Sequence, residues 1–179
     1  MAAQEGRRLT PLEGRRVAVL TLSDSIARGA HPDTSGDLIV QMITGLGAAV
    51  GARDVLSDDR QAIAARLRAY ADDLRVDLVL TSGGSGVASR DVTPEATLDV
   101  IERPVPGLPE TARQRTLAAT PLAMLSRGVA GIRGRTLIVN LPGSPKGVRE
   151  WLDVLLPVLP HALSLLAEET RPWGTPHSP

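Results

Sequence analysis

Hydrophobic residues of the chain occur in short β-branched runs that alternate with longer stretches of helical spacing. Apolar runs bounded by turn residues are typical of buried strands. We expect strands at RVAVLTL (16–22), AAVGARDVL (48–56), VDLVLTS (76–82) and GVAGIRGRTLIVNL (128–141). The last segment contains two short strands, and Thr136–Leu141 is apolar enough to lie inside a sheet.

Apolar residues at helical spacing predict helices between these strands. The helical segments begin near Ser35, after Asp58 and Asp59, near Thr93, within 104–119 and at about Val148, where one long amphipathic helix runs to Leu166. We expect Thr93 to be an N-cap, with Pro94 at the first helical position. Glu95 then lies in the first turn, where its charge complements the helix dipole.

Strands that alternate with helices predict an α/β fold, in which helices cover both faces of a mostly parallel sheet. We expect a single domain at 15–166, between a flexible arm at 1–14 and a flexible, Pro-rich tail at 167–179. Ligands bind beyond the carboxyl ends of the strands in such sheets. The loops at these ends are LSDS, TSGGSG and NLPGSP.

The composition excludes several classes of protein. Twenty basic and 20 acidic residues give a formal net charge of zero, which argues against nucleic-acid binding through bulk charge. The absence of cysteine excludes disulfides and thiolate metal sites. The sequence shows neither a secretory h-region nor a membrane-spanning apolar run, so we expect a cytoplasmic protein.

The loop TSGGSG has the composition of an anion-binding loop. Glycines at 83, 84 and 86 permit positive φ, so that successive backbone N–H groups can point into one concavity. The hydroxyls of Thr81, Ser82 and Ser85 would add donors for a phosphate. A tight strand-to-helix connection explains the composition equally well, and neither a Walker A loop nor a dinucleotide-binding fingerprint is present.

Asp91 follows this loop, and a carboxylate beside a phosphate is useful when a cation lies between them. Mg²⁺ suits that position, because it is commonly held by one or two carboxylates and phosphate oxygens. Asp58 and Asp59 follow the second strand and could lie in the same crevice, although their spacing favours helix capping. Arg90 would contact a phosphate or be a surface charge.

Two other features leave two interpretations open, and the histidines are assigned no role. Ser23 and Asp24 would bind polar groups of a substrate or satisfy the end of the first strand. Lys146, the only lysine, would contact a phosphate or extend over a helical turn. The three histidines have no spacing typical of a metal site.

Four segments within 15–166 resemble the MogA/MoaB family of molybdenum-cofactor biosynthesis proteins, and they follow one another along the chain in the family's order. TSGGSGVASRDVTPEA and NLPGSPKGV are similar to the family patterns TTGGTG…RDxTPEA and NLPGxPKxV. VAVLTLSDSIARGAHPDTSGDLI and VLSDDRQAI are similar to VLTVSDxxxxGxxxDxSG and VxPDDxxxI. Serines at 82 and 85 replace threonines and keep the hydroxyls.

The resemblance implies an α/β three-layer sandwich that binds molybdopterin, a pterin dithiolene with a terminal phosphate. In the adenylyltransferase branch, AMP passes from ATP to that phosphate with Mg²⁺ as cofactor, and pyrophosphate is released. By matching motifs, Asp58 and Asp91 are implied as catalytic, metal-binding residues. The remaining implied binding residues are Ser82, Gly83, Gly84, Ser85 and Gly86 at the phosphate, and Ser23, Asp24, Pro142, Gly143 and Ser144 at the pterin or nucleotide.

The family likeness leaves a second activity open. A MoaB-type member would bind molybdopterin as a carrier or scaffold without catalysis. The resemblance also implies a homotrimer or hexamer, and as partners the upstream molybdopterin synthase and the downstream molybdate-inserting protein.

Overall fold

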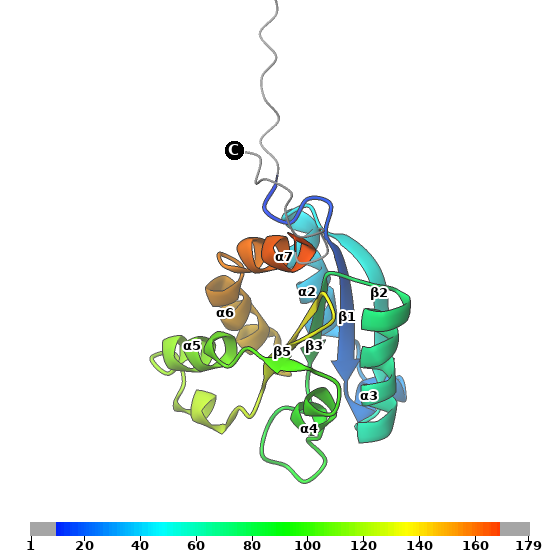
Figure 1. The fold of residues 1–179 in the computed structure, drawn as a ribbon. Helices are drawn as coiled ribbons and strands as arrows, with labels where there is room; N and C mark the ends of the chain where they lie inside the picture. Colours follow the sequence, from blue (N-terminus) through cyan, green and yellow to red (C-terminus); the bar gives the residue numbers. More distant parts are fainter. Residues whose placement is uncertain (1–9, 169–179) are drawn as a thin grey trace, which may run out of the picture.

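A six-stranded sheet forms the middle layer of the structure, a computed structural model that describes residues 10–168 (Figure 1). In sheet order the strands are β2 (Ala49–Leu56), β1 (Arg16–Leu22), β3 (Leu78–Ser82), β6 (Thr136–Leu141), β5 (Ala130–Arg133) and β4 (Arg103–Pro104). The first four run parallel, whereas β5 is antiparallel to β6 and β4 to β5. The predicted mostly parallel sheet and its strands are confirmed, and the two-residue β4 is additional.

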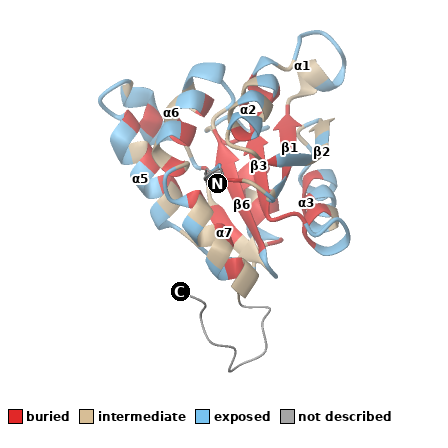
Figure 2. Cartoon of the chain, turned by 90° about the horizontal axis from the view of Figure 1, so that it is seen from above, coloured by how far each residue is buried: buried red, intermediate tan, exposed pale blue. Residues whose placement is uncertain are grey.

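Helices connect the strands and cover both faces of the sheet. They are α1 (Asp24–Ala27), α2 (Thr34–Gly45), α3 (Arg60–Arg68), α4 (Thr93–Leu98), α5 (Gly107–Thr116), α6 (Pro145–Leu155) and α7 (Leu159–Glu168). A π-helical turn, η1 (Ala69–Asp73), continues α3, and a 3-10 helix, η2 (Pro121–Leu125), follows α5. In Figure 2, α6 and α3 lie on opposite sides of the buried strands.

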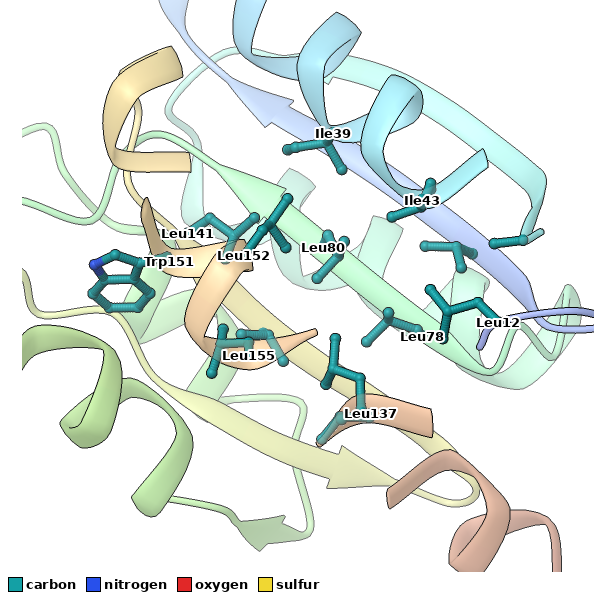
Figure 3. Close-up of a cluster of buried hydrophobic side chains, with 14 of the residues drawn as sticks. Leu12, Ile39, Ile43, Leu78, Leu80, Leu137, Leu141, Trp151, Leu152 and Leu155 are labelled. Carbon is teal, nitrogen blue, oxygen red and sulfur yellow. The ribbon is translucent and has the colours of Figure 1, made fainter. Parts of the chain in front are cut away.

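Two hydrophobic clusters fill the spaces between the sheet and its two helical layers. Successive strand residues point to opposite faces, so Val17 and Val19 of β1 enter one cluster, whereas Ala18 and Leu20 enter the other. Helices α2, α5, α6 and α7 cover the first cluster, and α3, η1 and α4 cover the second. Figure 3 shows the first cluster, with Trp151 of α6 at its edge.

The carboxyl-terminal helical segment is broken, so the prediction of one long helix at 148–166 is wrong. Helices α6 and α7 are bent by 63° at the break, which contains Pro157. Proline has no N–H and its ring clashes with the carbonyl four residues earlier, so α6 cannot continue through it. Within residues 10–168, no single helix is long and apolar enough to cross a membrane.

Residues 10–14, which the sequence placed in a loose arm, are packed against the domain. Leu12 is fully buried in the first hydrophobic cluster, and its N–H donates to the Leu46 carbonyl at 2.8 Å. Residues 10–14 form a turn that packs on the end of α2, so the packed domain begins before residue 15. Residues 1–9 of the predicted arm and 169–179 of the predicted tail lie outside the described residues, and Ala167 and Glu168 belong to α7.

Asn140, fully buried at the end of β6, joins three elements below the ligand-binding edge of the sheet. Its amide nitrogen donates to Thr81 Oγ1 at 3.0 Å and to Thr97 Oγ1 at 2.9 Å, which connects β6 to β3 and α4. Its Oδ1 accepts from the Val129 N–H at 3.2 Å. The asparagine of the NLPG segment is therefore a structural cross-link.

We expect Asn140→Ala to lower the free energy of unfolding by about 2–4 kcal/mol, because it removes three hydrogen bonds and leaves buried polar groups unpaired. Urea unfolding followed by circular dichroism measures this loss. Gln114→Ala, on the exposed side of α5, is the control and should change stability by less than about 0.5 kcal/mol. Equal stability of the two variants would contradict the cross-linking role.

Candidate active site

The loops after β1, β2 and β3 enclose a cavity of about 240 Å³ at the carboxyl edge of the sheet. Ser23 and Asp24 follow β1, Asp58 follows β2, and Gly84 and Asp91 follow β3. Parallel strands bring their carboxyl ends to one edge, which explains how residues so distant in sequence line one cavity. Five of the predicted site residues therefore line one cavity: Ser23, Asp24, Asp58, Gly84 and Asp91.

A second cavity, of about 380 Å³, lies on the other side of the glycine loop. Gly84 and Asp91 line both cavities, whereas Gly86, Pro142 and Gly143 line only the second. Its rim is apolar and includes Val87, Leu122 and Leu125. Two spaces of different character, one charged and one partly apolar, thus meet at Gly84 and Asp91.

The glycines permit the loop backbone to pass very close to neighbouring groups. Gly83 and Gly84 have φ values of +99° and +61°, which non-glycine residues rarely adopt. A Cβ on Gly83 would collide with the Leu22 carbonyl. A Cβ on Gly84 would collide with Thr93 Oγ1 and lie 3.0 Å from Asp58 Oδ1. Both glycines are therefore required where this loop meets β1 and the acidic residues.

The hydroxyls of the loop are used within the protein, which corrects their assignment as phosphate donors. Ser82 Oγ donates to the Pro142 carbonyl at 2.9 Å, and Ser85 Oγ donates to the Leu141 carbonyl at 3.4 Å. Thr81 is fully buried below the loop. These contacts bind the β3 loop to the β6 loop.

Asp58 has a buried oxygen without a partner. Its Oδ1 accepts no hydrogen bond within the described part of the chain. Burial, and then the negative charges of Asp24 and Asp91, raise the pKa of Asp58 above its ordinary value. The Asp58 N–H donates to Asp24 Oδ1 at 3.2 Å, which keeps these two carboxylates together. An unpaired carboxylate oxygen that lies near two other carboxylates is a favourable position for a cation.

The neighbouring Asp59 has the capping role that spacing favoured for both residues. Its carboxylate accepts from the Ala62 N–H at 2.7 Å at the start of α3. The capping interpretation is confirmed for Asp59 and wrong for Asp58, whose side chain lines the cavity. Of these two adjacent carboxylates, Asp59 caps a helix and Asp58 faces the cavity.

The carboxylate of Asp91 is held by its own loop. Its Oδ2 accepts from the Ala88 N–H at 2.9 Å, and Gly86 approaches so closely that a Cβ there would lie 2.9 Å from this oxygen. Asp58 and Asp91 offer the oxygen ligands that Mg²⁺ prefers. No group of three or more His, Cys, Asp or Glu residues suited to a metal ion occurs among residues 10–168. A metal held here would take its other ligands from substrate and water.

Thr93 supports the glycine loop instead of capping α4. Its Oγ1 donates to the Gly83 carbonyl at 2.9 Å, and its N–H donates to the Gly84 carbonyl at 3.0 Å. The N-cap of α4 is Val92, which makes no side-chain bond. The predicted capping role of Thr93 is therefore wrong, and Pro94 lies at the second helical position instead of the first, whereas Glu95 lies in the first turn as predicted.

Ser23 and Asp24 combine both roles that the sequence left open. Ser23 caps α1, with its Oγ accepting from the Ile26 N–H at 3.4 Å, and both residues line the first cavity. Ser144 caps α6, where its Oγ accepts from the Gly147 N–H at 3.1 Å. The Gly143 carbonyl accepts from Ser35 Oγ at 2.7 Å, so this turn is fixed against α2.

Lys146 does not line the cavity that contains Asp58 and Asp91. Its exposed side chain lies 3.8 Å from Glu150 and lines a separate cavity between α2 and α6. A contact of Lys146 with a phosphate beside Asp58 or Asp91 is therefore not supported.

Arg127, which sequence analysis did not single out, holds the glycine loop in place. Its Nε donates to the Gly86 carbonyl at 2.6 Å and its Nη2 to the Asp91 carbonyl at 2.6 Å. Its Nη1 is paired with Glu95, and this hydrogen bond lowers the pKa of the Glu95 carboxyl. One guanidinium thus joins both ends of the loop to α4.

We expect Arg127→Lys to loosen this loop, because an ammonium cannot make the divergent contacts of a planar guanidinium. Amide hydrogen exchange across 84–93 should become about tenfold faster or more, since a charge-assisted hydrogen bond contributes about 1.5 kcal/mol or more. Arg133→Lys is the matched control, because Arg133 pairs with Asp72 far from the loop in sequence. Unchanged amide exchange across 84–93 in Arg127→Lys would show that the contacts of Arg127 are not needed to hold the glycine loop.

The fold and this two-cavity site define a ligand-binding α/β domain, and comparison with known proteins specifies its family. Residues 18–161 match the family described as "Probable molybdopterin binding domain". The chain therefore belongs to the molybdopterin-binding domain family.

Individual relatives agree with this assignment. The chain is 39% identical over 152 residues to a molybdopterin adenylyltransferase of Helicobacter pylori strain J99, covering 84% of this chain and 86% of the relative. It is 40% identical over 140 residues to the molybdopterin adenylyltransferase of Escherichia coli K12, covering 77% and 72%. The crystal structure of the molybdopterin biosynthesis enzyme MoaB from Thermus thermophilus is 52% identical, with a TM-score of 0.82, and the match covers 89% and 99%.

Proposed function

We propose that the protein is a molybdopterin adenylyltransferase, which transfers AMP from ATP to the terminal phosphate of molybdopterin. The observation that carries this proposal is the meeting of two cavities at Gly84 and Asp91, beside the unpaired oxygen of Asp58. A transfer between two bound substrates needs such a junction, because the reacting groups must come into contact. The names of the relatives from Helicobacter pylori and Escherichia coli support the same activity.

The chemistry requires positioning more than it requires a nucleophilic side chain. An oxygen of the molybdopterin phosphate attacks the α-phosphorus of ATP, the bond from that phosphorus to the bridging oxygen of the β-phosphate breaks, and pyrophosphate leaves. Phosphoryl-type transfers depend mainly on alignment and charge neutralisation. Gly84 lines both cavities at the junction, and the contacts of Thr93 and Arg127 keep the backbone of the glycine loop in place.

Asp58 and Asp91 would hold Mg²⁺ at this junction. The ion would offset the negative charge of the reacting phosphates. The residues fit this role because Asp58 Oδ1 has no partner within residues 10–168, and because Asp24 and Asp91 already raise the pKa of Asp58. Binding a cation relieves the repulsion among these carboxylates.

The test of this function is pyrophosphate release that depends on both substrates. Purified protein is given ATP and Mg²⁺ with or without molybdopterin, and pyrophosphate is measured with a coupled enzyme. An adenylyltransferase releases one pyrophosphate for each molybdopterin consumed and little without it. A carrier or scaffold of the MoaB type would bind molybdopterin and release none, which would overturn the proposal. The homotrimer or hexamer implied by the family likeness stays a prediction, and light scattering tests it.

A further inference from the structure

Two arginines line the first cavity together with the acidic residues. Arg28 comes from the connection between α1 and α2, and Arg90 comes from the β3–α4 loop. Both are exposed, and neither is paired with a carboxylate among residues 10–168, although the charge of Arg90 acts on Asp58 and opposes the rise in its pKa. Elsewhere, arginines such as Arg53 and Arg60 are paired with aspartates. Two unpaired guanidinium groups beside several carboxylates indicate that the cavity binds an anion as well as a cation.

The backbone around Arg28 fixes where its side chain begins. Arg28 is the C-cap of α1: its N–H donates to the Asp24 carbonyl at 3.2 Å, and the Gly29 N–H donates to the Ile26 carbonyl at 2.8 Å. Gly29 follows with a φ of +74°, the conformation that commonly ends a helix. Because Asp24 and Arg28 are four residues apart across this turn, both are presented to the same cavity. A positive charge is thereby placed at the mouth of an acidic site.

The acidic and basic groups of the first cavity differ in burial, and this difference distinguishes two positions for phosphate. Asp58 Oδ1 is buried, and Gly84 and Asp91 form the junction with the second cavity, so the phosphate that reacts belongs there. Arg28 and Arg90 are exposed at the mouth of the first cavity. Phosphates further along a polyphosphate chain would extend from the junction towards these arginines. A guanidinium binds such oxygens through two parallel hydrogen bonds.

We propose that Arg28, together with Arg90, binds the β- and γ-phosphates of the nucleotide and hence the pyrophosphate that leaves. This inference rests on the proposed adenylyl transfer for the order of the phosphates along the cavity. Negative charge develops on the leaving pyrophosphate as its bond to the α-phosphorus breaks, and the two guanidinium groups stabilise that charge. The same contacts select a triphosphate over a monophosphate.

The test compares pyrophosphate with AMP as ligands, measured by isothermal titration calorimetry at a fixed Mg²⁺ concentration. Arg28→Gln should weaken pyrophosphate binding about tenfold, because it removes a charge-assisted contact, and should leave AMP binding unchanged. Arg28→Lys, which keeps the charge but loses the paired geometry, should lie between Arg28→Gln and the unmodified chain. Arg115→Gln, an exposed arginine on α5, is the matched control and should bind both ligands normally.

The possible results separate this inference from the proposed function. An equal loss of AMP and pyrophosphate binding, or no loss of either, in Arg28→Gln would overturn the assignment of Arg28. Adenylation with normal pyrophosphate affinity in Arg28→Gln would leave the proposed function standing without this role. Selective loss of pyrophosphate binding in a protein that does not adenylate molybdopterin would support the polyphosphate site and overturn the proposed reaction.

Discussion

Asp58→Asn is expected to slow AMP transfer by about a hundredfold or more while molybdopterin binding changes little. The substitution keeps the shape of the side chain but removes the charge that is proposed to hold Mg²⁺ at the junction of the cavities. A residue whose contribution is electrostatic and specific to the reacting phosphates affects turnover more than binding. Single-turnover kinetics and equilibrium binding of molybdopterin measure the two quantities separately.

The matched control is the adjacent Asp59→Asn. Asp59 caps α3, and asparagine is as good an N-cap as aspartate, so this variant should keep both stability and turnover. Equal turnover of Asp58→Asn and Asp59→Asn would show that Asp58 takes no part in the reaction.

Asp58→Asn should also stabilise the ligand-free protein. The pKa of Asp58 is raised in the folded state, so its ionised form opposes folding at neutral pH, and that cost disappears as the pH falls towards the ordinary value of 3.8. An amide has no charge to bury and can donate to the neighbouring carboxylates. Asp58→Asn should therefore raise the melting temperature at pH 7 by about 2–4 °C, which corresponds to about 1 kcal/mol. The difference from the unmodified chain should shrink in acid.

Gly83→Ala is expected to lower the free energy of unfolding by about 2–4 kcal/mol. Alanine is strained at a φ of +99°, and its Cβ would collide with the Leu22 carbonyl of the adjacent strand β1. Relief of the collision requires the loop to move away from β1, which would also separate Gly84 from Asp58. Thermal unfolding and urea titration measure the loss.

Gly45→Ala is the control for this prediction. Gly45 is the last residue of α2, has an ordinary φ, and has no atom within 4 Å of the position of an added Cβ. Alanine there should be neutral or stabilising by up to about 1 kcal/mol. A Gly83→Ala variant as stable as Gly45→Ala would show that the loop tolerates a side chain and adopts another backbone path.

The sequence predicted the sheet because burial on both faces leaves a direct pattern. In β1, β3 and β6 every residue except Arg16 is buried and most are apolar, so each strand contains a continuous apolar run. The carboxyl-edge rule then located the loops that carry Asp58, Gly84 and Asp91. Helical periodicity was less reliable. The apolar residues of α6 and α7 all pack in the first hydrophobic cluster, so their spacing along the sequence resembles that of one helix across Pro157.

The detailed roles of polar residues required the structure. Spacing alone does not separate Asp58 from Asp59, because the difference lies in which carboxylate turns towards the Ala62 N–H, and only the family likeness singled out Asp58. Arg127 contacts Gly86 across 41 positions of the chain, a separation without any periodic signal. The hydroxyls of Ser82 and Ser85 have suitable chemistry for phosphate, but their acceptors are carbonyls of the β6 loop.

We propose that AMP is transferred at the junction formed by Asp58, Gly84 and Asp91. Radioactive label from α-labelled ATP, followed in a reaction with Mg²⁺ and molybdopterin, compares the unmodified protein with Asp58→Asn. Label should appear in the pterin product in equal amount to the pyrophosphate released, and Asp58→Asn should produce about a hundredfold less per unit time. Label that stays in ATP with the unmodified protein, or that is transferred equally fast by Asp58→Asn, would exclude AMP transfer that depends on this junction.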